Sequence, residues 1–130
     1  MKQLFLTALA IITTVIAYSQ NKPLDCSFFK SGDLAYRDST TNSVWKIKRT
    51  KKVQTETNEQ TGAVIRNKIE WISACEYKLT QTWTNKQEFK NRNHSWRIFQ
   101  IISVNDNIYT YRCNCNDGTK IEGTVVKMRY

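Results

Sequence analysis

The chain has 130 residues and a formal net charge of +9, with 12% aromatic residues. This length is that of one domain with a real but modest hydrophobic core, and it excludes a large multidomain enzyme. The basic excess and the aromatic content would suit nucleic acid, but the basic residues are scattered and the chain is expected to be exported. We therefore expect no nucleic-acid partner.

The N-terminus has the pattern of a secretory signal peptide. A short basic start precedes an apolar run from Leu4 to Ala17, and Ala17 and Ser19 are the small residues that a signal peptidase reads. The run of about 14 residues is too short to cross roughly 30 Å of hydrocarbon as a helix. We predict a signal peptide over residues 1–19, one domain over 20–130 that is periplasmic or secreted, and no transmembrane segment.

Short apolar or alternating stretches, separated by turn-forming residues, predict strands along the rest of the chain. No segment shows helical periodicity, and the polar residues 85–93 are expected to form an exposed loop. The predicted strands cover residues 28–36, 44–49, 53–57, 64–72, 75–83, 96–104, 108–115 and 119–129.

The longest alternation of apolar and polar residues, over 64–83, predicts a β-hairpin that turns at Ser73 and Ala74. An apolar face of this length needs a partner layer or a closed barrel to cover it. Eight strands joined by tight turns predict an all-β antiparallel up-and-down meander closed into a barrel, with a β-sandwich as the alternative. The residues expected on the inner face of the hairpin are Ile65, Asn67, Ile69, Trp71, Cys75, Tyr77, Leu79, Gln81 and Trp83.

Residues 26–79 contain the short motifs Cys26-x-x-Phe29-Lys30-x-Gly32, Trp45-x-Ile47-x-Arg49, Gln54-x-Glu56, Thr61-Gly62, Ile69-x-Trp71 and Cys75-Glu76-Tyr77-x-Leu79. With these motifs the chain resembles an uncharacterised family of small exported bacterial proteins. Some members of that family carry the label of DNA topoisomerase IV, but this short chain has no room for ATPase or cleavage domains. The strand pattern is also similar to the lipocalin-type barrel, which implies the architecture only, because Gly32-Asp33-Leu34 lacks the tryptophan of the usual Gly-x-Trp signature.

Four cysteines in an exported domain indicate disulfides, with three possible full pairings. In an eight-strand meander Cys26 precedes the first strand and Cys75 opens the fifth, so both lie at the same end and are expected to form a disulfide. If the second and third predicted strands are one bent strand, Cys26 instead faces Cys113 and Cys115. We interpret Cys113-Asn114-Cys115 as a local bridge or as two side chains on a strand face, rather than a redox or metal centre.

The sequence offers little catalytic chemistry. The single histidine, His94, lies in the predicted loop without a positioned partner, and Glu56 and Glu70 are expected to pair with surface lysines. Four glycines leave no glycine-rich phosphate loop. We therefore expect a protein that is not an enzyme and that uses no cofactor or metal.

Two functional classes remain. The first is an exported binding protein whose barrel holds a small apolar ligand or lipid. Its candidate ligand-binding residues are Asn67, Trp71, Tyr77, Leu79, Gln81 and Trp83. The alternative is a surface-interaction or inhibitor-like protein with a packed interior and no internal ligand. A basic run that would meet an anionic surface consists of Lys46, Lys48, Arg49, Lys51 and Lys52.

Overall fold

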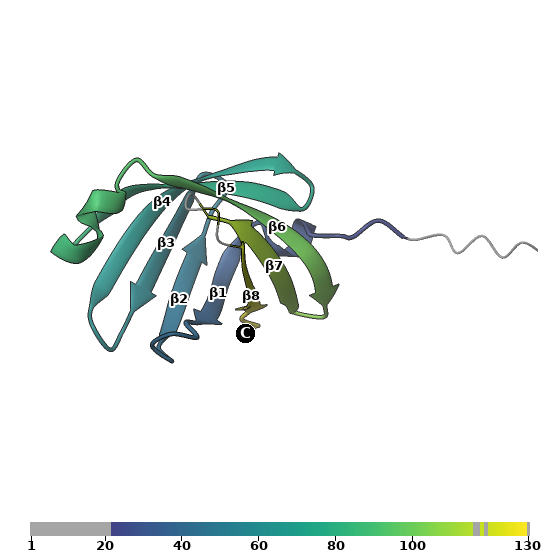
Figure 1. Cartoon of the computed structure of the whole chain (residues 1–130). Coiled ribbons are helices and arrows are strands. Elements are labelled where there is room, and N and C mark those ends of the chain that lie inside the picture. The colour runs from purple at the N-terminus through teal and green to yellow at the C-terminus, as the bar shows by residue number, and fades with distance from the viewer. Residues whose placement is uncertain (1–21, 116–117, 119, 130) are drawn as a thin grey trace, which may run out of the picture.

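The chain forms a closed barrel of eight antiparallel strands, in which every strand pairs with its neighbours in sequence order and β1 also pairs with β8 (Figure 1). The computed structural model describes residues 22–115, 118 and 120–129, so the predicted signal peptide lies outside the described residues. The predicted up-and-down barrel is confirmed, and the sandwich alternative is wrong. The strands are β1 (Gly32–Arg37), β2 (Val44–Arg49), β3 (Val53–Asn58), β4 (Ala63–Ser73), β5 (Glu76–Thr84), β6 (Trp96–Asn105), β7 (Ile108–Asn114) and β8 (Lys120–Lys127).

Two short 3-10 helices interrupt this pattern. The helix η1 (Ser27–Phe29) occupies the start of the first predicted strand, and β1 begins only at Gly32, whose φ of 108° favours glycine. The helix η2 (Gln87–Arg92) lies in the predicted loop and buries none of its residues. In the described part of the chain, no helix has the length and apolar character needed to cross a membrane.

The alternation of side chains along β2 decides which of them enter the barrel. Trp45, Ile47 and Arg49 are buried, and the residues between them are exposed. The prediction that Arg49 belongs to an exposed basic run is wrong, because Arg49 shares its face of the strand with the two apolar residues. The other members of that run are exposed: Lys46, Lys48, Lys51 and Lys52.

The strand β3 turns its polar face inward. Gln54, Glu56 and Asn58 are buried, whereas Val53 is exposed. The expectation that Glu56 pairs with a surface lysine is therefore wrong. The physical reason is the pairing of β3 with β2, which places Gln54 beside Arg49 on the inner face.

The hairpin of β4 and β5 follows the predicted alternation over most of its length, but a β-bulge changes its end. Arg66 pairs with Trp83 and Asn67 pairs with Gln81, so Thr82 is one extra residue on β5. The prediction that Trp83 lines the interior is wrong. Its side chain is 42% exposed, with Arg66 over the ring at 4.9 Å.

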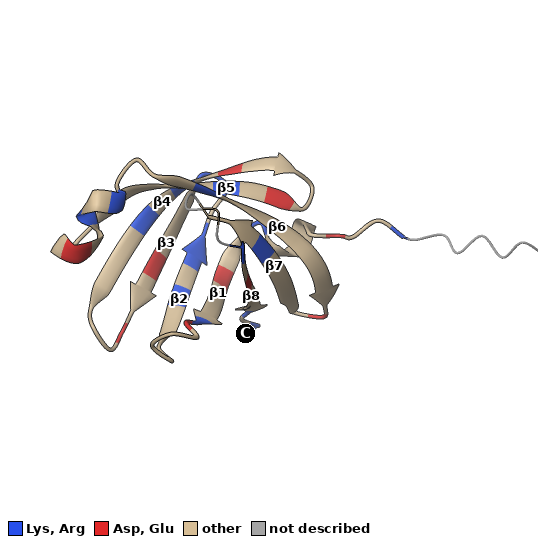
Figure 2. Ribbon diagram, in the orientation of Figure 1, with Lys and Arg blue, Asp and Glu red and all other residues tan. Residues whose placement is uncertain are grey.

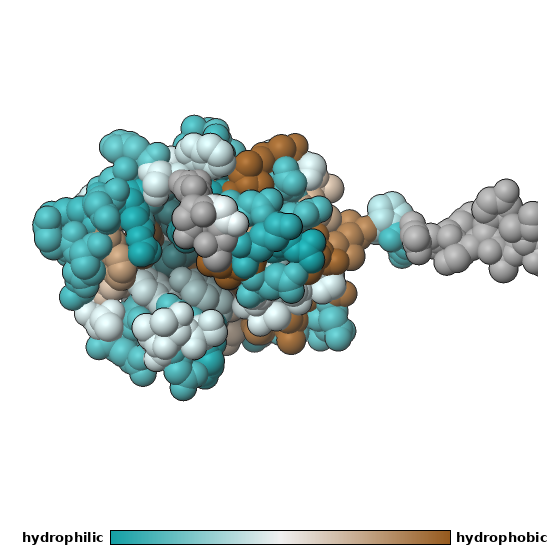
Figure 3. Space-filling view, in the orientation of Figure 1, coloured by the Kyte–Doolittle hydropathy of each residue, from teal (hydrophilic) through white to brown (hydrophobic). Residues whose placement is uncertain are grey.

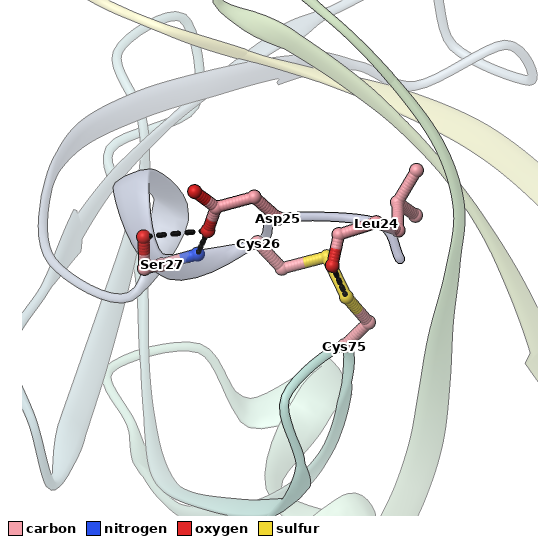
Figure 4. Close-up of a disulfide and its surroundings, with 5 residues drawn as sticks. All are labelled: Leu24, Asp25, Cys26, Ser27 and Cys75. Carbon is pink, nitrogen blue, oxygen red and sulfur yellow. Dashed lines mark hydrogen bonds between the residues drawn. A yellow bond between two sulfur atoms is a disulfide. The ribbon is translucent and has the colours of Figure 1, made fainter. Parts of the chain in front are cut away.

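A disulfide joins the segment before η1 to the turn of the β4–β5 hairpin (Figure 4). The Cys26–Cys75 bond confirms the predicted pairing, and the separate strands β2 and β3 remove the alternative in which the strand parity flips. Asp25 accepts hydrogen bonds from the backbone N–H and hydroxyl of Ser27, at 3.0 and 2.7 Å, and Phe29 is fully buried. The segment around η1 thus covers one end of the barrel and contributes to its core.

Charged residues are spread over the strands and η2 rather than gathered in one patch, with acidic segments among the basic ones (Figure 2). On the outer face of β4, Glu70 pairs with Lys68 at 3.0 Å and with Lys78 of β5 at 3.4 Å, as predicted. The apolar surface gathers on the side from which the N-terminal segment leaves (Figure 3). Leu24 and Phe28, which flank Cys26 in that segment, are both exposed.

Candidate functional site

A row of polar side chains crosses the inner wall of the barrel. The strand register places Arg49 of β2, Gln54 of β3, Asn67 of β4 and Gln81 of β5 side by side. All four are buried, with 1 to 3% of their surface exposed. Buried polar groups are normally hydrogen-bonded, so the partners of this row indicate what the interior can do.

The Arg49 guanidinium lies inside the barrel near η1. It donates hydrogen bonds to three acceptors: the side-chain oxygen of Gln54 at 2.8 Å, the carbonyl oxygen of Phe29 at 2.9 Å and the hydroxyl of Tyr109 at 3.1 Å. Three aromatic rings surround it, and its carbon Cζ lies 4.7 Å from the ring centre of Tyr77 and 5.9 Å from those of Tyr109 and Trp71. These contacts hold a buried cation to which no carboxylate of the described residues forms an ion pair.

Glu56 lies on the other side of Gln54. The Gln54 amide nitrogen donates a hydrogen bond of 2.7 Å to the Glu56 carboxyl, which connects Arg49 to Glu56 through one side chain. Burial raises the pKa of Glu56, and the charges of Arg97 and Arg49 and the bond from Gln54 offset this only in part. Glu56 is therefore a buried acid with raised proton affinity.

Asn67 is the exception in the polar row. Both polar atoms of its side chain are buried and have no hydrogen-bond partner within the part of the chain that the structure describes. Its two neighbours bond elsewhere: Gln54 bonds Arg49 and Glu56, and the amide nitrogen of Gln81 donates to the Phe89 carbonyl and to Asn93. A buried amide group without partners costs about 1 to 3 kcal/mol. The Asn67 carboxamide is thus a donor and an acceptor that the protein itself leaves unused.

Three residues near Glu56 are less deeply buried than the polar row. Tyr36, Arg97 and Tyr111 lie on the inner faces of β1, β6 and β7 and remain partly exposed. Burial raises the pKa of the Tyr36 phenol, and the nearby Glu56 carboxyl adds to this effect. Burial also raises the pKa of the Tyr111 phenol, to about 12. Gly123 of β8 leaves room for the Tyr111 phenol, because a Cβ at Gly123 would lie 2.5 Å from the phenol oxygen. The face in Figure 3 is hollowed near its centre, as expected for an incompletely covered barrel.

Five of the six predicted ligand-binding residues lie on the inner wall, and the sixth, Trp83, lies outside. Asn67 and Gln81 belong to the polar row, and Trp71 packs against Tyr77 with ring centres 4.9 Å apart. The sequence reasoning missed several inner residues. Those residues are Arg49, Gln54, Glu56, Arg97, Tyr109 and Tyr111. The signal that finds the first three is the alternation in β2 and β3, once the polar face of β3 is recognised as the inner one.

The donor groups of the described residues do not assemble a metal site, since no group of three or more His, Cys, Asp or Glu side chains lies close enough together among them. His94 has a positive φ of 70° and its backbone N–H donates to the Gln81 carbonyl at 2.7 Å, so its role in the fold is at the turn before β6. The chain matches no protein-family model, no curated protein sequence and no solved structure.

Proposed function

We propose that this protein is a β-barrel binding protein that holds a small amphipathic ligand in the half of its interior away from η1. The observation that supports this proposal most directly is the Asn67 carboxamide, which is buried and finds no partner for either of its polar atoms among the residues that the structure describes. A ligand that supplies one acceptor and one donor would satisfy both atoms. Ligand binding would then recover the free energy that the unpaired Asn67 amide costs the protein without ligand.

The polarity of the inner wall favours a ligand with a polar group over a purely apolar one. The wall beside Asn67 carries Gln54, Gln81 and Glu56, and a hydrocarbon placed against Asn67 would leave the donor and the acceptor of its amide unpaired. Ile65, Leu79 and the ring of Tyr111 provide apolar surface nearby. An amide, urea or protonated carboxyl group joined to a ring or short chain matches this combination of surfaces.

A test uses 1-anilinonaphthalene-8-sulfonate, which carries an N–H donor, acceptor oxygens and apolar rings. We expect the fluorescence of this probe to rise on binding, and Asn67→Leu to weaken binding about tenfold, which corresponds to about 1.4 kcal/mol. Gln100→Leu is the matched control, because Gln100 is an exposed amide on β6 that should leave binding unchanged. Equal affinity in both variants would contradict the interior site, as would native mass spectrometry and probe competition that find no bound species.

A second candidate function is recognition of a partner through the outer surface. Trp83 and Trp96 are large exposed rings on β5 and β6, and each lies beside a cation, Arg66 at 4.9 Å and Lys78 at 5.8 Å. Such surface tryptophans are frequent in protein interfaces. If the interior site fails the test above, replacement of both tryptophans by alanine should abolish partner binding without changing the thermal stability of the barrel.

A further inference from the structure

Cys113 and Cys115 lie at the end of β7, with their sulfur atoms 2.9 Å apart. Cys113 is 1% exposed and packs in the core of the barrel, whereas Cys115 follows the last residue of the strand and is half-buried. A disulfide bond is about 2.05 Å long, so a small movement of either side chain would join the two sulfurs. The pair therefore combines one half-buried cysteine with one fully buried cysteine.

A bond between these two residues would be less stable than the Cys26–Cys75 bond. Residues two apart in an extended strand have Cα atoms about 6.6 Å apart, near the upper limit that a disulfide tolerates. The Cα atoms of Cys26 and Cys75 are 5.4 Å apart, and that bond closes a loop with a sequence separation of 49. Strained or exposed disulfides have more oxidising potentials and exchange more readily with thiols.

Cys115 opens onto a groove that could seat a reacting partner. The groove has a volume of about 660 Å³ and lies beside the paired ends of β6 and β7, since Ile98 pairs with Asn114. Its lining consists of Glu76, Trp96, Ile98, Asn114 and Cys115. The exposed ring of Trp96 and the side chain of Ile98 give it an apolar wall next to the sulfur atom.

We propose that Cys113 and Cys115 form a thiol–disulfide exchange site, with Cys115 as the sulfur that reacts with a partner disulfide or thiol and Cys113 as the sulfur that resolves the mixed disulfide. This proposal does not depend on the interior binding site. The two cysteines would have this chemical role in addition to their packing in the barrel.

The reaction balances with a small disulfide as the oxidant. The Cys115 thiolate attacks one sulfur of that disulfide, a new S–S bond forms, and the other sulfur leaves as a thiolate that takes up a proton. Cys113 then loses its proton and attacks the Cys115 sulfur, which releases the second half of the oxidant as a thiol. The net result is a Cys113–Cys115 disulfide and two thiols, with both protons coming from the cysteine pair, and the reverse reaction oxidises two partner thiols.

The first experiment is a redox titration. The purified protein is equilibrated in glutathione buffers of graded potential, quenched with acid, alkylated and mapped by peptide mass spectrometry. We expect Cys113 and Cys115 to be reduced in buffers in which Cys26–Cys75 stays intact, with equilibrium constants that differ about tenfold or more, or about 30 mV. Reduction of both bonds together, or Cys113 and Cys115 that remain thiols in the most oxidising buffer, would overturn the proposal.

The second experiment separates the roles of the two sulfurs, with glutathione disulfide as the probe. In Cys113→Ser, the mixed disulfide at Cys115 has no resolving partner and should accumulate about tenfold above the level in the unsubstituted protein. In Cys115→Ser, the buried Cys113 should remain unmodified while the protein is folded. The double variant Cys113→Ser with Cys115→Ser is the control for reaction elsewhere. Equal modification in the two single variants, or none in Cys113→Ser, would contradict the assigned roles.

Discussion

Arg49 and Asn67 lie in the same polar row on the inner wall, on either side of Gln54, but their hydrogen bonding differs completely. Arg49 has three hydrogen-bond acceptors and three aromatic rings around it, so its buried charge is compensated. Asn67 has no partner for either polar atom in the described chain. A residue whose bonds are complete serves stability, and a buried residue with unused bonds is a candidate for ligand recognition.

Replacing Arg49 by methionine should destabilise the fold. Methionine replaces the long aliphatic part of the arginine side chain, but it donates no hydrogen bond. The side-chain oxygen of Gln54 and the carbonyl oxygen of Phe29 therefore lose the donor that Arg49 provides. We expect a loss of about 3 kcal/mol in the free energy of unfolding, measured by urea denaturation. Lys48→Met is the matched control, because the neighbouring Lys48 points outward and should change stability by less than about 0.5 kcal/mol. A loss under about 1 kcal/mol for Arg49→Met would show that the network contributes little.

Glu56 should give the barrel a stability that falls as the pH rises. Burial raises the pKa of Glu56 in the folded protein above the ordinary 4.5. Between pH 4.5 and that raised pKa, the folded state therefore binds more protons than the unfolded state. Its contribution is therefore complete below pH about 4.5 and is lost as the pH rises through the raised pKa. Glu56→Gln should reduce this pH dependence in urea unfolding between pH 4 and 8, whereas Glu88→Gln, at an exposed site, should retain it. A Glu56→Gln protein with the unchanged pH profile would contradict this role.

At the scale of elements, the β4–β5 hairpin shows how one extra residue redirects a strand. The bulge at Thr82 leaves Gln81 inside, moves Trp83 to the outer face and places Thr84 in the inner position. Thr84 can be buried because its hydroxyl donates to the Val64 carbonyl at 2.9 Å. The bulge thus removes one large ring from the interior at the side where η2 approaches β5.

The two tryptophans of this hairpin should respond very differently to truncation. Trp71 packs against the ring of Tyr77 and the guanidinium of Arg49, so Trp71→Ala should cost about 3 kcal/mol of unfolding free energy. Trp83 contacts Arg66 on the outside, and Trp83→Ala should cost less than about 1 kcal/mol. Urea denaturation of both variants measures the two losses of unfolding free energy. Equal losses would contradict the assignment of Trp71 to the interior and Trp83 to the outer face.

For the whole molecule, the closure of the barrel depends on contacts from outside the sheet. The seam between β1 and β8 has two paired positions, Leu34 with Lys127 and Ala35 with Val126, whereas the pairing of β7 with β8 has seven. Lys127 also donates to the Phe28 carbonyl and lies 4.0 Å from the centre of the Phe28 ring. The segment around η1, held by the disulfide, therefore covers one end of the barrel and reinforces its shortest seam.

The sequence by itself determined the strands, their order and the end at which Cys26 and Cys75 meet. These features are local or follow from counting strands: side chains alternate with a period of two, turn residues end each strand, and antiparallel directions alternate. The same local rule would have placed Arg49 inside, since it lies two residues beyond Ile47 in an alternating strand. The positive charge of Arg49 led to the expectation of a surface position, because most of the rings and acceptors that compensate the charge are far away in sequence.

Only the tertiary structure decided that the polar face of β3 is the inner one, where the bulge falls and which polar groups are satisfied. The polar face of β3 is buried because Gln54 meets Arg49, and Trp83 is exposed because Asn67 pairs with Gln81 across a shifted register. The unused amide of Asn67 is likewise visible only when all the neighbours of its side chain are known. Hydrogen-bond satisfaction is a property of three-dimensional surroundings, and a one-dimensional pattern of polar and apolar residues does not contain it.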